Sequence, residues 1–547
     1  MAREGSYVNI ELLRGTFILT AGVMISRLLG LFYVIPFYHL VGERGGALYG
    51  YGYVPYQIFL SLATGGLPVA VSKFVSKYNA LGEYGVGYRL FRSGLVLMIA
   101  SGIASWLILY ALAPILAPHV IDAKTNVNSV DDVTAVIRAV SFALLIVPVM
   151  SLIRGFFQGH ESMGPTALSQ VVEQIARIAF LLGACYVILR LMDGSIVSAV
   201  SAATFAAFVG AAAGLLVLLV YWWKRRPYLQ SLLARDRGEA DVSLLAMYKE
   251  LLLSSIPFVF VGLSISLYQL VDQFTFNHAM AAAGRGNISE HAYSVFNMWA
   301  QKLVIIPVTL ATSFSLALIP TITKAYVAQD RKALRQYLNQ TFQVLMFLTL
   351  PAVIGMAVLA GPVYSSFYSY DPLGEQVLRW YAPAAILYAL FSVTAAIMQG
   401  INEQRFTVVS LTAGLLVKLL LNTPLIMKWS AVGAIVATMA GYFVSVAFNL
   451  WVIQRRTRYR YRFVARRTAF MAILTAAMSA AVMGVEALAA RWIDYRDSTA
   501  QSVSAVAIGA AVGAAVYLFL SIRSGLFSVL FGDRFAFWRR KEKKAVS

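Results

Sequence analysis

Long runs of apolar residues, separated by short polar segments, repeat along this chain from one end to the other. Each run is about 20 residues or longer, which is the length that an α-helix needs to cross the hydrocarbon core of a bilayer. The pattern therefore predicts an all-α polytopic membrane protein with fourteen transmembrane helices. The predicted spans lie near residues 14–39, 53–76, 90–117, 134–157, 166–190, 195–223, 248–277, 292–323, 338–365, 376–400, 405–427, 431–454, 466–490 and 501–522.

Composition supports the membrane assignment and adds an orientation. Charged residues are only 13% of the 547, against about 25% in a soluble domain. The net charge of +20 collects in alternate connecting segments, above all near 224–249, 455–467 and 534–544. Positive charge in alternate loops is typical of the cytoplasmic side of a membrane protein. The distribution of charge thus predicts that both termini are cytoplasmic. It explains the positive net charge without nucleic-acid binding.

The two halves of the chain resemble each other at several points in the same order. Because each half holds six spans, an even number, both halves have the same orientation and a pseudo-twofold axis along the membrane normal. The repeat predicts an N-lobe over 1–235, a C-lobe over 236–460, and a segment 461–547 with the last two spans and a basic tail. The matched positions are Leu97-Met98 with Leu345-Met346, Pro114 with Pro362, Gln158-Gly159 with Gln399-Gly400, and Arg177 with Lys418.

Motifs of hydrolytic enzymes are missing from the sequence. It contains neither a Walker A motif nor a zinc-binding HExxH helix. Its single cysteine, Cys185, lies in an apolar span and reads as a small buried residue. The sequence thus contains no recognisable ATP-hydrolysing or zinc-hydrolase apparatus, and we expect no enzymatic activity and no bound cofactor or metal.

Two cations inside predicted spans are the first candidate site residues. Arg27 lies in the first span and Lys302 in the eighth. A charge at bilayer depth is costly, so such a residue is a functional-site hypothesis by default. Buried cations indicate an anionic cargo, and we interpret Arg27 and Lys302 as substrate-binding residues.

Several motifs, most of them near the N-terminus, carry a family resemblance over the whole chain. They are Leu13-Arg14-Gly15-Thr16-Phe17, Ser26-Arg27-Leu28-Leu29-Gly30, Val41 to Leu48, Ala70 to Phe74, and Ala300-Gln301-Lys302-Leu303. The chain resembles the MurJ/SpoVB/YtgP group of the multidrug/oligosaccharidyl-lipid/polysaccharide (MOP) exporter superfamily. The N-terminal motifs are most similar to the YtgP-type members of Gram-positive bacteria.

The resemblance implies a function and a location. It implies a flippase in the bacterial cytoplasmic membrane that moves lipid II, an anionic lipid-linked pyrophosphate, outward by alternating access. Arg27 and Lys302 match cationic cavity positions of the family, although Lys302 stands where relatives have an arginine. The membrane and cell-wall synthesis proteins are the expected partners, and the membrane potential or protons the expected energy source.

A further group of polar residues lies in spans seven and eleven. Asp272 resembles a carboxylate that helps to bind sodium in some relatives, and Lys418 and Asn422 match its partner positions. Since an ammonium group is incompatible with a bound cation, sodium coupling is doubtful here. A structural Asp272–Lys418 ion pair is the favoured interpretation, and a proton-linked pair is the alternative.

A second charge pair and three rival functions complete the predictions. Glu173 and Arg177 are spaced i,i+4 on span five, which predicts an ion pair on one helix face.

A flippase for another polyprenyl-linked polysaccharide or a sporulation-specific precursor would use the same cations. A cation-coupled drug antiporter would favour acidic cavity residues, and a scaffold for cell-wall synthesis would need no buried cations.

Overall fold

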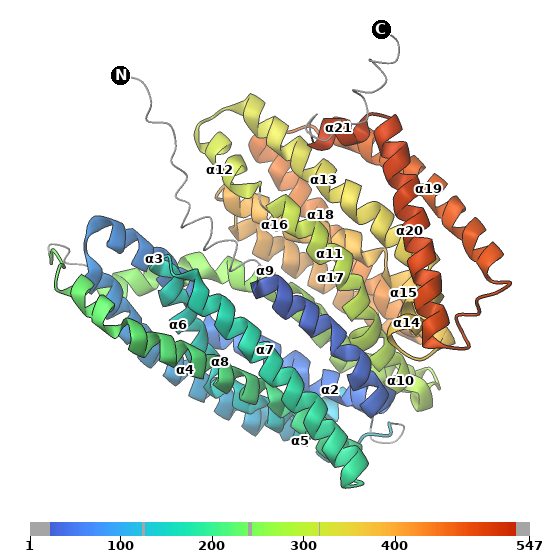
Figure 1. Ribbon diagram of the computed structural model, residues 1–547, viewed down its shortest axis with the longest axis horizontal. Coiled ribbons are helices and arrows are strands. Elements are labelled where there is room, and N and C mark those ends of the chain that lie inside the picture. The colour runs from blue at the N-terminus through green and yellow to red at the C-terminus, as the bar shows by residue number, and fades with distance from the viewer. Residues whose placement is uncertain (1–21, 123–125, 239–242, 317, 532–547) are drawn as a thin grey trace. The chain divides into compact units, whose positions relative to one another are not determined.

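The computed structural model describes residues 22–122, 126–238, 243–316 and 318–531. Every regular element in these ranges is a helix (Figure 1). Among the described residues, 12 helices are long and apolar enough to cross a membrane, or 13 if one bent pair counts as a span. These 12 coincide one for one with the predicted spans from 90–117 to 501–522. The prediction of an all-helical, multi-pass membrane protein is confirmed.

The first part of the chain differs from its predicted boundaries. A helix over Gly22–Phe32 is bent by 40° against the next helix, α2 (Val34–Thr64). Gly42 interrupts α2 with a φ of 62° and a ψ of −161°. The predicted single span 53–76 is wrong, because Gly65 and Gly66, both at positive φ, end α2 before α3 begins. Residues 14–21 of the first predicted span lie outside the described residues.

The contacts divide the chain into two compact units, Met1–Ser294 and Val295–Ser547. The first unit holds the helix Gly22–Phe32 and nine labelled α-helices. They are α2, α3 (Leu67–Leu81), α4 (Tyr84–Val120), α5 (Val130–Ser141), α6 (Val147–Gly159), α7 (Met163–Tyr186), α8 (Ile196–Leu233), α9 (Leu244–Ala282) and α10 (Ser289–Ser294).

The most extensive helix contact of the first unit joins α7 to α8. Small residues allow this close approach, as is usual between membrane helices. A Cβ at Gly210 would lie 2.8 Å from the Glu173 carbonyl oxygen, and one at Gly214 would lie 3.2 Å from that of Ser169. Any larger residue at these two positions on α8 would push α7 away.

The second unit begins with a π-helical turn, Val295–Ala300, and all its other regular elements are helices where it is described. Its closest helix pair is α17 with α18, and a Cβ at Gly433 would lie only 2.0 Å from the Leu425 carbonyl oxygen. The helices are α11 (Gln301–Leu316), α12 (Ile319–Val327), α13 (Arg331–Val358), α14 (Ala360–Phe367), α15 (Pro372–Tyr381), α16 (Ala384–Gly400), α17 (Arg405–Trp429), α18 (Ala431–Thr457), α19 (Arg462–Ala489), α20 (Thr499–Arg523) and α21 (Leu526–Phe531).

The basic connection between α18 and α19 is held in place by two tyrosines. Tyr459 donates a hydrogen bond to Asn339 Oδ1 on α13 at 2.5 Å, and Tyr461 donates to the Leu450 carbonyl at 2.9 Å. Burial raises the pKa of both tyrosine hydroxyls. They therefore stay protonated and keep donating these bonds at neutral pH.

A buried carboxylate on α10 holds the connection between α4 and α5. Glu290 is 6% exposed. It accepts hydrogen bonds from the Val127 N–H at 2.9 Å, the Asn128 N–H at 3.2 Å and the Asn128 side-chain amide at 3.0 Å. One side chain thus satisfies two backbone donors that have no helical partner.

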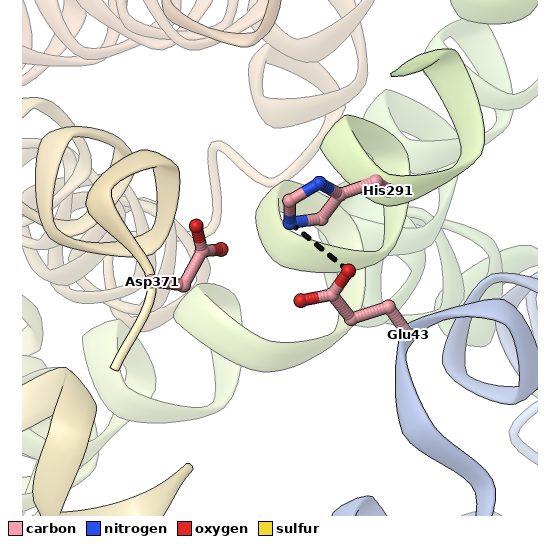
Figure 2. A group of neighbouring side chains, drawn as sticks. All are labelled: Glu43, His291 and Asp371. Carbon is pink, nitrogen blue, oxygen red and sulfur yellow. Dashed lines mark ion pairs between the residues drawn. The ribbon is translucent and has the colours of Figure 1, made fainter. Parts of the chain in front are cut away.

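The same short helix also contacts α2. His291 Nε2 lies 3.1 Å from Glu43 Oε2 (Figure 2). Glu43 follows directly on Gly42, where α2 is interrupted. Together with Glu290, this contact fastens α10 to two other parts of the first unit.

We expect Glu290→Gln to lower the stability of the protein by about 1–3 kcal/mol, because an amide nitrogen replaces one acceptor and leaves a buried donor unsatisfied. The change is measured as a lower unfolding temperature of the purified chain. Asp131→Asn, on an exposed acid at the start of α5, is the matched control and should unfold like the parent. Equal unfolding temperatures for both variants would contradict the role given to Glu290.

Candidate functional site

Arg27 lies on the exposed side of the first helix. This helix packs on α7 through its glycines: a Cβ at Gly22 would lie 2.9 Å from Ala167 Cβ, and one at Gly30 would lie 3.2 Å from Gln174 Nε2. Met24 on the neighbouring turn is 57% exposed, and Arg27 is exposed as well. The packing against α7 therefore leaves the guanidinium of Arg27 accessible to a ligand.

Lys302 lies one residue into α11, directly after the π-helical turn Val295–Ala300. The turn is fully buried, and Tyr368 donates a hydrogen bond to the Trp299 carbonyl at 3.2 Å. A π-helical turn is wider than an α-helical one and is frequent at functional sites. Lys302 is half-buried, between the buried Gln301 and Leu303, inside the candidate span Gly286–Ser313.

The charge pair predicted on span five is present and has a third member. Arg177 lies 2.9 Å from Glu173 Oε1, and Arg154 on α6 lies 2.8 Å from Glu173 Oε2. Arg154 also donates to Ser169 Oγ at 2.6 Å. The sequence predicts a pair that neutralises itself, whereas the structure contains two arginines around one carboxylate. Arg154 is one of two arginines inside the predicted span 134–157, with Arg138, and it was not singled out from the sequence.

Tyrosines of α2 surround Arg177. Its guanidinium donates to the Tyr53 hydroxyl at 3.4 Å. Tyr53 stacks on Tyr49 with ring centroids 5.2 Å apart, and Tyr56 lies 5.4 Å from Tyr53 on its other side. The three tyrosines share one face of α2 at helical spacing. They give the cluster a wall that is aromatic and also carries hydroxyl groups.

Asp272 lies on the polar face of α9 and is 2% exposed. Its neighbours on this face bind α2: Gln273 donates to the Tyr51 carbonyl at 2.9 Å, and Asn277 donates to the Tyr51 hydroxyl at 2.7 Å. Sequence reasoning missed Gln273 and Asn277, although polar residues four apart in an apolar span are a recognisable signal. This hydrogen-bonded face fixes the position of Asp272 within the first unit.

Lys418 and Asn422 are fully buried on α17 in the second unit. Lys418 Nζ donates a hydrogen bond to Thr438 Oγ1 on α18 at 2.5 Å. Thr438 in turn donates to the Ala434 carbonyl at 2.8 Å. The i,i+4 spacing places both residues on one buried face, as the sequence predicts. The predicted pairing of Lys418 with Asp272 stays a prediction.

Solved structures with similar folds define the class of protein. A lipid II flippase MurJ in an inward closed conformation matches 94% of this chain and 99% of its own, with a TM-score of 0.63 and 14% sequence identity. An inward-facing multidrug resistance MATE family transporter of the MOP superfamily matches 81% of this chain and 98% of its own, with a TM-score of 0.60 and 16% identity. At these identities the likeness shows the fold, which is that of a multi-pass membrane transporter.

Sequence comparison then shows the family. The model of the family described as "Polysaccharide biosynthesis protein" matches residues 12–326, and the MatE model matches residues 257–423. The protein "Lipid II flippase MurJ" of Bacillus subtilis (strain 168) is 47% identical over 543 residues, which cover 98% of this chain and 100% of that protein. The chain belongs to the MurJ family, within the MOP superfamily.

Proposed function

We propose that this chain is a lipid II flippase, which moves the lipid-linked peptidoglycan precursor from the cytoplasmic to the outer leaflet of the membrane. The observation that carries the proposal is the 47% identity to the Bacillus subtilis flippase over the full length of both chains. The chain is a transporter and not an enzyme, because flipping makes and breaks no covalent bond.

Arg27 and Lys302 are the proposed contacts for the pyrophosphate. Arg27 is exposed on the first helix, and Lys302 is half-buried at the start of α11. A pyrophosphate has several anionic oxygens, and charge-assisted hydrogen bonds to them are the strong ones. The lobes then alternate between access from the cytoplasm and access from outside. A membrane potential that is negative inside contributes about 2.3 kcal/mol per charge per 100 mV to outward movement of an anion.

The proposed architecture has fourteen spans, in two six-helix lobes over 1–235 and 236–460 with two further spans after them. Twelve candidate spans are already separate helices. Before α4, the bent pair of the helix Gly22–Phe32 and α2 remains, and Gly42 divides α2. The helical residues before Gly42 supply span one, and those after it supply span two. Each half of the chain also contains a tightly packed hairpin with a cation: α7–α8 with the half-buried Arg177, and α17–α18 with the fully buried Lys418. The basic connections support a cytoplasmic location for both termini.

Coupling to the membrane potential or to protons is proposed in preference to coupling to sodium. Lys418 fills its buried place on α17 with an ammonium group, which already donates a hydrogen bond to Thr438. A sodium ion in the same place would meet a like charge in a medium of low dielectric constant. Cell-wall synthesis proteins are the proposed partners that deliver lipid II and use it after transport.

The test is rescue of a bacterial strain depleted of all its lipid II flippases. Expression of this chain is expected to restore growth and to return labelled lipid II to the outer leaflet, as measured with a membrane-impermeant modifying enzyme. Growth without outward lipid II, or no rescue despite normal protein levels, would refute the proposal. Rescue of a strain that lacks a carrier for another polyprenyl-linked polysaccharide would then indicate a different headgroup.

A further inference from the structure

The cluster formed by Arg154, Glu173 and Arg177 has more positive than negative charge. Two guanidinium groups share one carboxylate, so the formal charge is one positive unit. The side chains are only 12%, 15% and 19% exposed, in that order. An uncompensated charge is expensive to bury away from water and from a counter-ion. A second anion is therefore the expected partner of this cluster.

Arg154 has its hydrogen bonds within the protein. It donates to Glu173 at 2.8 Å and twice to Ser169 Oγ, at 3.1 Å and 2.6 Å. The Ser169 hydroxyl in turn donates a hydrogen bond to the Gly214 carbonyl at 3.0 Å, so the network closes on α8. Arg154 thus acts as the internal counter-ion of Glu173.

Arg177 has hydrogen-bond donors that the described residues do not use. One of its nitrogens bonds Glu173 at 2.9 Å, and another makes a long contact of 3.4 Å to the Tyr53 hydroxyl. Its Nε atom is buried and has no hydrogen-bond partner among the described residues. A guanidinium can donate five hydrogen bonds, and this one uses only part of that number. The excess positive charge and the unused donor lie on the same side chain.

The surroundings suit an anion. The hydroxyl of Tyr53 can donate as well as accept a hydrogen bond. The helix that carries Arg27 packs on α7 next to the cluster, because Gly30 is in contact with Gln174, the residue that follows Glu173. The helix that carries Arg27 and this cluster are therefore neighbours on α7.

We propose that Arg177 is a second contact for a phosphate-class anion, held in place by Glu173 and Arg154. The inference rests on the proposed function and deepens it, since the anion is assigned to the pyrophosphate of the cargo. In this arrangement Glu173 is a positioning residue that lowers the affinity of the site for anions, because its carboxylate repels them. Packing of α7 on α8 does not require the second arginine, since glycines already provide the close approach.

The decisive experiment compares a variant that removes a positive charge from the cluster with a variant that removes its negative charge. The purified full-length chain is titrated with undecaprenyl pyrophosphate, and with phosphatidylglycerol in parallel, at two salt concentrations. We expect Arg177→Gln to weaken binding of the pyrophosphate lipid about tenfold and Glu173→Gln to tighten it about tenfold, which corresponds to about 1.4 kcal/mol in each direction. Arg177→Lys, which keeps the charge without the planar fork, should fall between Arg177→Gln and the parent.

Three further variants separate binding from folding. Glu173→Gln combined with Arg154→Gln restores the original net charge and should bind like the parent. Glu375→Gln and Arg379→Gln, which alter a second i,i+4 pair with a 2.7 Å contact on α15, should leave binding unchanged. Unfolding temperatures are recorded for all variants.

Weakened binding in both Glu173→Gln and Arg177→Gln, with equal losses of stability, would overturn the inference and leave a structural ion cluster. If the variants change the affinity for phosphatidylglycerol as much as the affinity for the pyrophosphate lipid, the assignment of the anion to the cargo is overturned. If the parent chain does not bind the pyrophosphate lipid at all, the proposed function fails. If the parent binds but no cluster variant changes its affinity, only this inference fails.

Discussion

Arg27→Ala should abolish rescue of a flippase-depleted strain while leaving the amount of protein in the membrane close to normal. Arg27 is exposed, so its loss should hardly affect folding. A hydrogen bond between charged groups is worth about 1.5–3 kcal/mol, which corresponds to a loss of about 10- to 100-fold in affinity for the pyrophosphate. Lys302→Ala should have the same effect, whereas Lys302→Arg keeps the charge and should still support growth. Growth and outward lipid II are the two measurements.

The matched control for this prediction is Lys332→Ala, which removes an exposed cation at the start of α13. It lowers the net charge by the same amount and should rescue fully. Full rescue by both Arg27→Ala and Lys302→Ala would show that neither cation is needed for the cargo.

Asp272→Asn and Lys418→Met should each impair folding or transport severely, and their combination should recover part of the loss. Both residues are buried, at 2% and 0% exposure. In the proposed Asp272–Lys418 ion pair, removing one partner costs about 3–5 kcal/mol, because the other charge is left uncompensated. In the double variant neither charge remains, so the penalty falls. Unfolding temperature and outward lipid II are measured for the three variants and the parent.

The double-variant cycle distinguishes pairing from two independent roles. Strictly additive losses would rule out a direct Asp272–Lys418 interaction. Transport should also continue when sodium is replaced by potassium, and strict dependence on sodium would show that Lys418 does not take the place of an ion. Lys428→Met, at the end of the same helix α17, is the control and should behave like the parent.

Sequence periodicity predicted most of the helices and failed where glycine controls the backbone. Hydrophobicity is a sum over about 20 residues, so it located every span after α3. It cannot detect a single residue at positive φ, and Gly42, Gly65 and Gly66 therefore moved the boundaries of α2 and α3. The π-helical turn before Lys302 was likewise invisible, since its composition is that of any buried helix.

The site residues were predicted in the same uneven way. Glu173 and Arg177 were found because i,i+4 spacing is a local property of one helix. Arg154 joins them from α6 through tertiary packing alone, and no local pattern connects it to α7. Gln273 and Asn277 have a local signal in their i,i+4 spacing, but their partners on α2 are far away in the sequence and could not be assigned from it.

The hairpin of α17 and α18 has a mechanical consequence. The two helices are joined at three heights: Gly433 against the Leu425 carbonyl, Thr438 bonded to Lys418, and Ser445 donating to the Ser410 carbonyl. Sliding one helix along the other by a single turn would break all three contacts together. The hairpin must therefore tilt or rotate as one stiff rod during transport, and the deformation that each cycle requires has to occur at its ends.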